Sequence, residues 1–360
     1  MTMERILIIA DSPLGDSSYA TVGKELAKML KNKYDVYYGG LQYIGKPLRL
    51  DGYTLLSFNN LQNTYDNLVN QQKFDHIIYL RNSWAIGTQG DPFRIIRPFS
   101  DDIILYTPVE EQKLPKRFFK GLKGYDETNY YDRIITMTKT GRDIINGYGI
   151  ESDYLYHNIN EVKICRTHYS GIEKNVLNIS YSLDYRKNIG SYILMAKHNI
   201  DYNFNWLGLS QYYVISDYID IYNAKNFNVI NQHRNYGSFN FLSDEQIADI
   251  YGKHTYYVQC SFKEGFDLTV LEALSNGLIT FMPNDMLHKE LFGDYPNAVF
   301  VNGNYEYPAM NQLEYFIPLS EWNKAFQLTV PRKRMGINIK DRFSFDSVKQ
   351  KLYKIISKSD

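Results

Sequence analysis

The sequence predicts an α/β protein built from two doubly wound domains, each with a mostly parallel sheet. Short, nearly continuous apolar runs recur along the chain with amphipathic stretches between them. Such runs are typical of parallel strands that helices cover on both faces. The chain has 360 residues, and at about 150 residues per domain this length suffices for two cores.

The first half begins with a strand, a loop and a helix. Ile6 to Ala10 is apolar throughout, and helical spacing then follows. The apolar positions of that helix are Tyr19, Val22, Leu26 and Leu30, and Lys24, Glu25 and Lys28 are expected on its outer side. Further strands are predicted at Val36 to Tyr38, Thr54 to Phe58, His76 to Leu80, Ile103 to Thr107 and Ile134 to Met137.

A second series of strands begins after a stretch of weak periodicity at 158–174. The predicted strands are Val176 to Tyr181, Phe204 to Leu207, Tyr256 to Cys260, Leu278 to Met282 and Ala298 to Val301. Weak periodicity with polar residues is typical of a domain boundary. We therefore expect domains at 1–160 and 161–335. A closing segment at 336–360 contains a last helix at Ser347 to Ile356, and the alternative that this segment crosses back to the first domain stays open.

Composition and charge exclude several classes of protein. Forty basic residues balance 40 acidic ones, so the basic surplus of a nucleic-acid-binding protein is missing. No apolar run is long enough to span a membrane, and the first one is too short for a signal peptide. The two cysteines and seven histidines show no metal-binding spacing. We expect a cytoplasmic protein without a metal ion or resident cofactor; its oligomeric state stays open.

Loops after parallel strands carry ligand sites in open sheets. The first such loop holds Gly15 just before a helix, where an anion could meet free backbone N–H groups. A plain turn explains this glycine equally well.

The densest motif runs from Ser261 to Gly277, between two predicted strands. Glu264, Gly265 and Phe266 stand in its loop, and Glu272 stands in the helix that ends at Gly277. Structural accounts exist for both carboxylates. Thr269 and Glu272 have the spacing of a capping box, and Glu264 could be a solvated loop residue.

The spacing of Glu264 and Glu272, with Gly265-Phe266 between them, resembles the motif of retaining GT-B glycosyltransferases, specifically glycosyltransferase family 4. Phe241 to Tyr251 is similar to the segment that precedes the motif in that family, with Ser243 and Gln246 as its helix cap. Arg186-Lys187 is similar to its phosphate-binding segment. The resemblance implies a GT-B fold, in which two Rossmann-like domains face each other across a cleft and a C-terminal helix closes the structure.

The resemblance also implies roles for individual residues. The first domain would bind the acceptor and the second a nucleotide diphosphate sugar. Glu264, Lys187 and Arg186 would form the catalytic group, in which the cations neutralise the departing diphosphate. Gly15, Gly265, Phe266, Glu272 and Phe241 would bind the donor, with Glu272 accepting hydrogen bonds from ribose hydroxyls. The implied reaction moves a sugar to an acceptor with retention of anomeric configuration and without a metal ion.

The sequence departs from the family in three places, one of which is Asn240, where a glycine commonly precedes the segment at Phe241. Ser180, Tyr181 and Ser182 stand where a Gly-Arg pair is usual, and no histidine follows Ile103 to Thr107, where many members carry one. The missing arginine and histidine leave open a non-catalytic nucleotide-sugar-binding protein of the same fold. Another enzyme class on this fold, such as a nucleotide-sugar epimerase or a phosphorylase, stays open as well.

The acceptor is not identified by the sequence and could be a glycan, a lipid or a protein. Lysines and an arginine alternate with apolar residues between Lys113 and Lys123. Such a basic amphipathic segment can contact anionic lipid, which leaves peripheral membrane contact open. An ordinary helix with inward phenylalanines explains the pattern as well.

Overall fold

The computed structural model describes residues 3–15, 17–82, 85, 93–110, 131–166, 174–180, 185–208, 212–230, 242–306, 314–329 and 335–357. The chain divides into two compact units. Unit 1 consists of Met1–Asn158 together with Arg342–Asp360, and unit 2 consists of Ile159–Asp341. The sequence placed the first boundary at residue 160, close to this division.

Unit 1 is built on a sheet that has eight strands within the described ranges, in the order β3-β4-β2-β1-β5-β6-β7-β8. All neighbours pair in parallel except β3 and β4, which are antiparallel. The strands are β1 (Arg5–Asp11), β2 (Asp35–Leu41), β3 (Leu48–Leu50), β4 (Tyr53–Phe58), β5 (His76–Leu80), β6 (Ile103–Thr107), β7 (Arg133–Thr136) and β8 (Asp153–Tyr154). Every residue of β5 and β6 is buried, which explains why these strands are apolar except for His76 and Thr107 at their ends.

The helices described in unit 1 are α1 (Ser18–Leu30), α2 (Leu61–Val69), α3 (Phe93–Ile96), α5 (Lys139–Gly147) and α12 (Phe345–Ile356), with a short 3-10 turn, η2 (Arg97–Phe99). A further 3-10 turn, η5 (Asp341–Phe343), spans the point where the chain passes from unit 2 back to unit 1. Helix α1 begins as expected, because the Ser17 hydroxyl accepts a hydrogen bond from the N–H of Ala20 at 3.0 Å. The expectation that Glu25 lies on the outer side was wrong. Its carboxylate is buried between Lys28 and the side-chain amide of Asn158, which donates to it at 2.8 Å.

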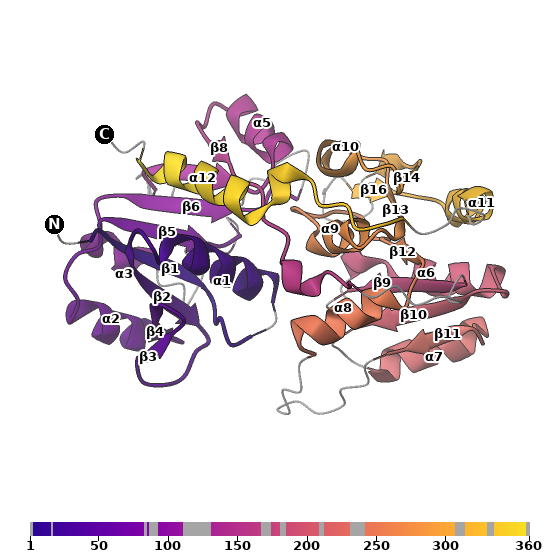
Figure 1. Cartoon of the computed structure of the whole chain (residues 1–360), viewed down its shortest axis with the longest axis horizontal. Helices are drawn as coiled ribbons and strands as arrows, with labels where there is room; N and C mark the ends of the chain where they lie inside the picture. Colours follow the sequence, from indigo (N-terminus) through magenta and orange to yellow (C-terminus); the bar gives the residue numbers. More distant parts are fainter. Residues whose placement is uncertain are drawn as a thin grey trace. The chain divides into compact units, whose positions relative to one another are not determined.

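The last helix, α12, belongs to unit 1 and runs beside its sheet (Figure 1). The Tyr353 hydroxyl donates to the carbonyl oxygen of Met29 on α1 at 2.7 Å. Arg133, at the start of β7, donates to the carbonyl oxygen of Ile355. Segments far apart in the sequence thus complete one core.

Unit 2 is built on a parallel sheet that has six strands in the described part of the chain, in the order β11-β10-β9-β12-β13-β14. Counted from β9, this is the order 3-2-1-4-5-6 of dinucleotide-binding sheets. The strands are β9 (Asn175–Ile179), β10 (Asn203–Leu207), β11 (Phe227–Val229), β12 (Tyr256–Val258), β13 (Ile279–Pro283) and β14 (Ala298–Val301), and an antiparallel hairpin adds β15 (Asn304–Glu306) and β16 (Glu314–Phe316).

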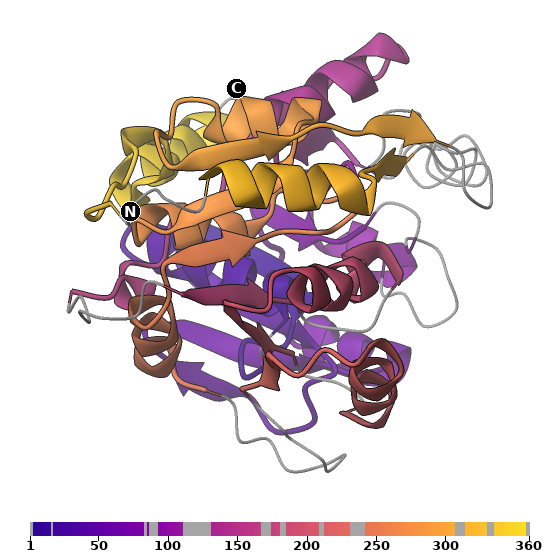
Figure 2. The ribbon, with the colours of Figure 1, turned by 90° about the vertical axis from the view of Figure 1, so that its right-hand side faces the viewer.

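Helices cover both faces of this sheet (Figures 1 and 2). One face carries α6 (Ile189–His198), α7 (Tyr212–Tyr222) and α11 (Leu319–Thr329), and the other carries α8 (Asp244–Gly252), α9 (Leu268–Ser275) and α10 (Met286–Phe292). Two short 3-10 turns, η3 (Glu161–Lys163) and η4 (Tyr185–Lys187), complete the unit. The predicted cap of α8 is confirmed, since Ser243 and Gln246 form a capping box.

The predicted doubly wound α/β architecture is confirmed, and each predicted strand overlaps an observed one. Strands β3, β8, β11, β15 and β16 were not predicted, because they have three residues or fewer and lack an apolar run. No helix in the described ranges is long and apolar enough to cross a membrane. The basic segment at 113–123 lies outside the described residues.

Candidate functional site

The candidate site lies at the carboxyl ends of two neighbouring strands in unit 2. Strand β9 pairs with β12 in the middle of the sheet, where the strand order reverses. Turn η4 follows β9, and the loop of residues 259–267 follows β12. Ligands of open parallel sheets bind at this reversal, outside the carboxyl ends of the strands.

The structure brings Lys187 of η4 and Glu264 of the second loop together. The Lys187 Nζ atom lies 2.5 Å from Oε1 of Glu264, and the two side chains are 18% and 11% exposed. Burial opposes the charged form of Lys187, but the Glu264 carboxylate outweighs it and raises the pKa of Lys187. Lys187 is therefore a cation at neutral pH.

Arg186 is part of the same contact between the loops. Its carbonyl oxygen accepts a hydrogen bond from the N–H of Phe262 at 2.8 Å. This backbone bond holds η4 beside the loop that carries Glu264. Gly265 and Phe266 follow in that loop, and Phe266 is buried. Phe241 lies outside the described residues, so its expected role in donor binding stays a prediction.

Helix α9 begins at Leu268, and its N-cap is Asp267, not Thr269. The Asp267 carboxylate accepts from the N–H of Val270 at 3.2 Å and from the hydroxyl of Thr269 at 3.0 Å. The capping box considered for Thr269 and Glu272 was therefore wrong, because the helix starts one residue before Thr269. The predicted end at Gly277 is confirmed. Its φ of +81° suits glycine, and an added Cβ would lie 2.1 Å from the carbonyl oxygen of Met335.

Glu272 lies one turn further along α9 and has partners of its own. Lys163 donates to its Oε1 at 2.7 Å, and the Tyr251 hydroxyl donates to its Oε2 at 2.9 Å. The Glu272 side chain is 6% exposed. The structure thus pairs Lys187 with Glu264, and Glu272 with Lys163 in the segment that follows the boundary between the units.

Sequence reasoning missed a buried histidine next to this site. His288 lies on α10, which follows β13, the neighbour of β12. Its Nδ1 lies 2.7 Å from Oδ1 of Asp285, and its Nε2 lies 3.2 Å from Oδ2 of Asp267. Asp285 is the N-cap of α10, three residues before His288. This capping spacing was the sequence signal that could have indicated that the two side chains lie close together.

The hairpin β15-β16 supplies another buried group that the sequence did not reveal. Oε1 of Glu314 accepts from the Tyr185 hydroxyl at 2.6 Å and lies 3.4 Å from Nζ of Lys263. Tyr185 is two residues before Lys187, and Lys263 directly precedes Glu264. Glu314 thus bridges the two loops that carry the ion pair.

In unit 1, Gly15 lies in a turn, where its N–H donates to the carbonyl oxygen of Ser12 at 2.9 Å. Donor binding by Gly15 stays a prediction. His76, the first residue of β5, has its Nδ1 2.5 Å from the Asp102 carboxylate. Arg133 pairs with the same carboxylate, so His76 is part of a structural cluster at that end of the strand.

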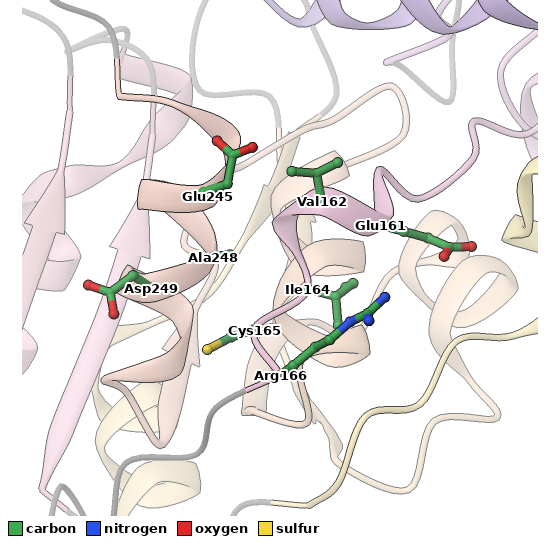
Figure 3. Close-up of a pocket in the computed structure, with 8 residues that line it drawn as sticks. All are labelled: Glu161, Val162, Ile164, Cys165, Arg166, Glu245, Ala248 and Asp249. Carbon is green, nitrogen blue, oxygen red and sulfur yellow. The ribbon is translucent and has the colours of Figure 1, made fainter.

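A pocket of about 490 Å³ lies between η3 and α8 (Figure 3). Its lining residues are Glu161, Val162, Ile164, Cys165, Arg166, Glu245, Ala248 and Asp249. Figure 3 shows the sulfur of Cys165 directed toward α8. With three carboxylates against one guanidinium in this lining, the pocket does not favour an anionic ligand. The loops around Lys187 suit an anion better.

No protein-family model matches the chain, and no curated protein matches it. Solved structures do match. Sucrose-phosphate synthase from Thermosynechococcus elongatus has a TM-score of 0.75 and 11% identity, over 99% of this chain and 98% of that one. HepE from Anabaena, solved with UDP and glucose, has a TM-score of 0.66 and 12% identity over 98% and 99%. The α,α-trehalose 6-phosphate synthase from Burkholderia multivorans has a TM-score of 0.62 and 10% identity over 99% of each chain.

These similarities cover nearly the whole chain and show that its fold is GT-B. The predicted fold class is thereby confirmed. Membership of glycosyltransferase family 4 stays a prediction.

Proposed function

We propose that the protein is a glycosyltransferase that moves a sugar from a nucleotide diphosphate sugar to an acceptor, with retention of anomeric configuration and without a metal ion. The observation that carries the proposal is the pairing of Lys187 with Glu264 on adjacent loops at the reversal point of the unit 2 sheet. The GT-B fold supports it, as does HepE, a structural neighbour solved with UDP and glucose. Unit 2 would hold the donor and unit 1 the acceptor.

Sugar transfer builds negative charge on the departing diphosphate and positive charge at the anomeric carbon. The bond from this carbon to the phosphate oxygen breaks, and its electron pair leaves with the diphosphate. Lys187, Arg186 and the free N–H groups at the start of α9 would stabilise that charge. Because protein cations supply the compensation, the proposal includes no metal ion.

Retention requires the acceptor to attack the face that the diphosphate leaves. In the proposed step the acceptor oxygen bonds to the anomeric carbon on that face, and its proton passes to the departing phosphate oxygen. Glu264, Gly265 and Phe266 would face the donor sugar. The scheme therefore assigns no protein nucleophile.

Glu272 would bind the ribose of the donor. A carboxylate has about four acceptor positions, and Lys163 and Tyr251 occupy two of them. Capacity thus remains for ribose hydroxyls. Because Lys163 lies close by, it would contact the same part of the nucleotide.

The test is to incubate the full chain with UDP, GDP and ADP sugars in EDTA and to measure nucleotide release with and without a panel of glycan, lipid and peptide acceptors. We expect one donor to be turned over, and Lys187→Met to lower turnover on the order of a hundredfold to a thousandfold. Lys253→Met, which removes an exposed lysine of unit 2 paired with Asp249, is the control and should leave turnover unchanged.

Other outcomes would contradict the proposal. Nucleotide binding without turnover of any donor would indicate a binding protein, and conversion of the donor sugar without an acceptor would indicate an epimerase. Loss of activity in EDTA that Mg²⁺ restores would refute metal independence. An inverted product would refute retention.

A further inference from the structure

His288 is a fully buried histidine with a carboxylate at each ring nitrogen. The exposed fractions of the His288, Asp285 and Asp267 side chains are 0%, 10% and 2%. A neutral imidazole can donate from one nitrogen only. Because both neighbours are acceptors, the geometry requires both nitrogens to be protonated. His288 is thus a buried cation to which the scheme above assigns no role.

Asp267 is the partner that links this cation to the candidate site. Its φ is +71° and its ψ is +68°, a left-handed conformation that is uncommon for residues other than glycine and that surrounding contacts can stabilise. Four donors do so. Thr269 and Val270 donate to Oδ1 of Asp267. Gln259 donates to Oδ2 at 2.7 Å, and His288 donates to the same oxygen at 3.2 Å.

These four hydrogen bonds, which act as a clamp on the turn, affect the candidate site because of where Asp267 lies in the chain. Asp267 caps α9 and directly follows Glu264, Gly265 and Phe266. The backbone conformation at Asp267 therefore fixes where these residues and the first N–H groups of α9 point. His288 anchors this turn to α10, whose own cap is Asp285.

We propose that His288 is a positioning residue, which acts through Asp267 to hold the left-handed turn at the start of α9 and so orients the N–H groups that receive the diphosphate. This inference rests on the proposed function for the identity of the ligand. His288 does not itself contact the donor.

The charges around His288 support this role. The charged groups that face this cluster are Asp285 on α10, Asp267 at the start of α9, and Lys187 on η4, which interacts electrostatically with Asp267. Burial disfavours the imidazolium, but the two carboxylates outweigh it and raise the pKa of His288 to about 10. A neutral side chain here would leave the Asp267 charge to compete with the diphosphate for Lys187.

The first experiment replaces His288 by glutamine, which keeps one N–H donor but removes the charge. His254→Gln is the matched control, because His254 is also a buried histidine of unit 2, with Nδ1 at 2.6 Å from the carbonyl oxygen of Ile250. Calorimetry compares UDP with uridine, GDP with guanosine, and ADP with adenosine. For the nucleotide that binds, we expect His288→Gln to weaken diphosphate affinity roughly tenfold to a hundredfold, as for a group that acts through charge or helix orientation. The affinity of His288→Gln for the nucleoside should change less than about twofold. In the control, His254→Gln, the affinities for the diphosphate and for the nucleoside should both change less than about twofold.

Two results would overturn the inference. Unchanged diphosphate affinity in His288→Gln would show that the cation has no effect on the site. An equal loss for diphosphate and nucleoside would show a general structural defect instead.

A second variant tests whether His288 acts through Asp267. In Asp267→Gly the turn no longer needs a clamp, because glycine adopts left-handed backbone freely. Adding His288→Gln to this variant should therefore change diphosphate affinity less than about twofold. The same tenfold or greater loss in both backgrounds would refute the mechanism. This comparison also stays informative when His288→Gln alone does not fold.

A nucleotide-independent measurement separates this inference from the proposed function. Nuclear magnetic resonance of the wild type at pH 8 should show both ring nitrogens of His288 protonated. His288→Gln should shift the amide signals of Gly265 and Phe266, whereas His254→Gln should not. A wild type that binds none of the nucleotides would refute the proposed function, while unshifted amides would refute the positioning role.

Discussion

Replacing Lys187 by methionine removes the cation beside Glu264 and keeps most of the apolar stem. Both side chains are more than four-fifths buried. The Glu264 carboxylate therefore loses its charge partner at a place where little water can solvate the remaining charge. Breaking a fully buried pair costs about 3 to 5 kcal/mol. Because these side chains keep some contact with water, we expect a loss of about 2 to 3 kcal/mol in the free energy of unfolding.

A double-mutant cycle separates the structural from the catalytic part of this interaction. Glu264→Gln alone leaves a buried ammonium and should also destabilise unit 2. The double variant removes both charges, so its destabilisation should be smaller than the sum of the single ones by about 1 to 2 kcal/mol. Activity should not recover in the same way, since the diphosphate still lacks its cation.

The assay uses the full chain and its tryptophan fluorescence in urea. Trp206 and Trp322 are fully buried in unit 2, and Trp84 belongs to unit 1. A Trp84→Phe background therefore reports unit 2 alone. Additive losses of stability would refute the pairing, and a double variant with wild-type turnover would show that the pair is structural and not catalytic.

Three further predictions concern the surroundings of this pair. Glu314→Gln should weaken the bridge between the two loops and lower kcat/KM about tenfold in steady-state kinetics. The control is Glu306→Gln, at the exposed position opposite Glu314 in the hairpin, which should leave kcat/KM unchanged. Equal effects of the two substitutions would contradict this prediction. The folded-state pKa of His288 is raised to about 10 from an ordinary value near 6.5. Its stabilising contribution should therefore be complete below about pH 6.5 and be lost as the pH rises through about 10, so the unfolding free energies of wild type and His288→Gln should converge over that range. A constant difference would show that His288 does not titrate there. Gly277→Ala should destabilise unit 2 by about 2 to 4 kcal/mol in the same urea assay, because the backbone is left-handed and the new Cβ meets a carbonyl oxygen; a loss below about 0.5 kcal/mol would show that the chain relaxes there.

Sequence patterns predicted the elements whose physical cause is local. Strands β5, β6 and β14 begin and end where predicted, because each is a largely apolar run with polar or turn residues on both sides. The cap of α8 and the end of α9 at Gly277 followed from residues a few positions apart. Lys187 and Glu264 were singled out by the resemblance to a glycosyltransferase motif, and each lies in a loop that follows an apolar run.

Other features depended on contacts between distant segments. Glu25 has the position of a solvent-facing helix residue, but the amide of Asn158 buries it. Glu272 is buried beside Lys163, 109 positions earlier in the chain, which donates to its carboxylate. No local pattern distinguishes these carboxylates from exposed ones.

The sequence by itself determined the two doubly wound units and the loops in which ligand chemistry would lie. Only the tertiary structure decided which charges meet: Lys187 with Glu264, and His288 with Asp267 and Asp285. The physical reason is that periodicity and capping act over a few residues, whereas the energy of a charge depends on every group that folding places around it.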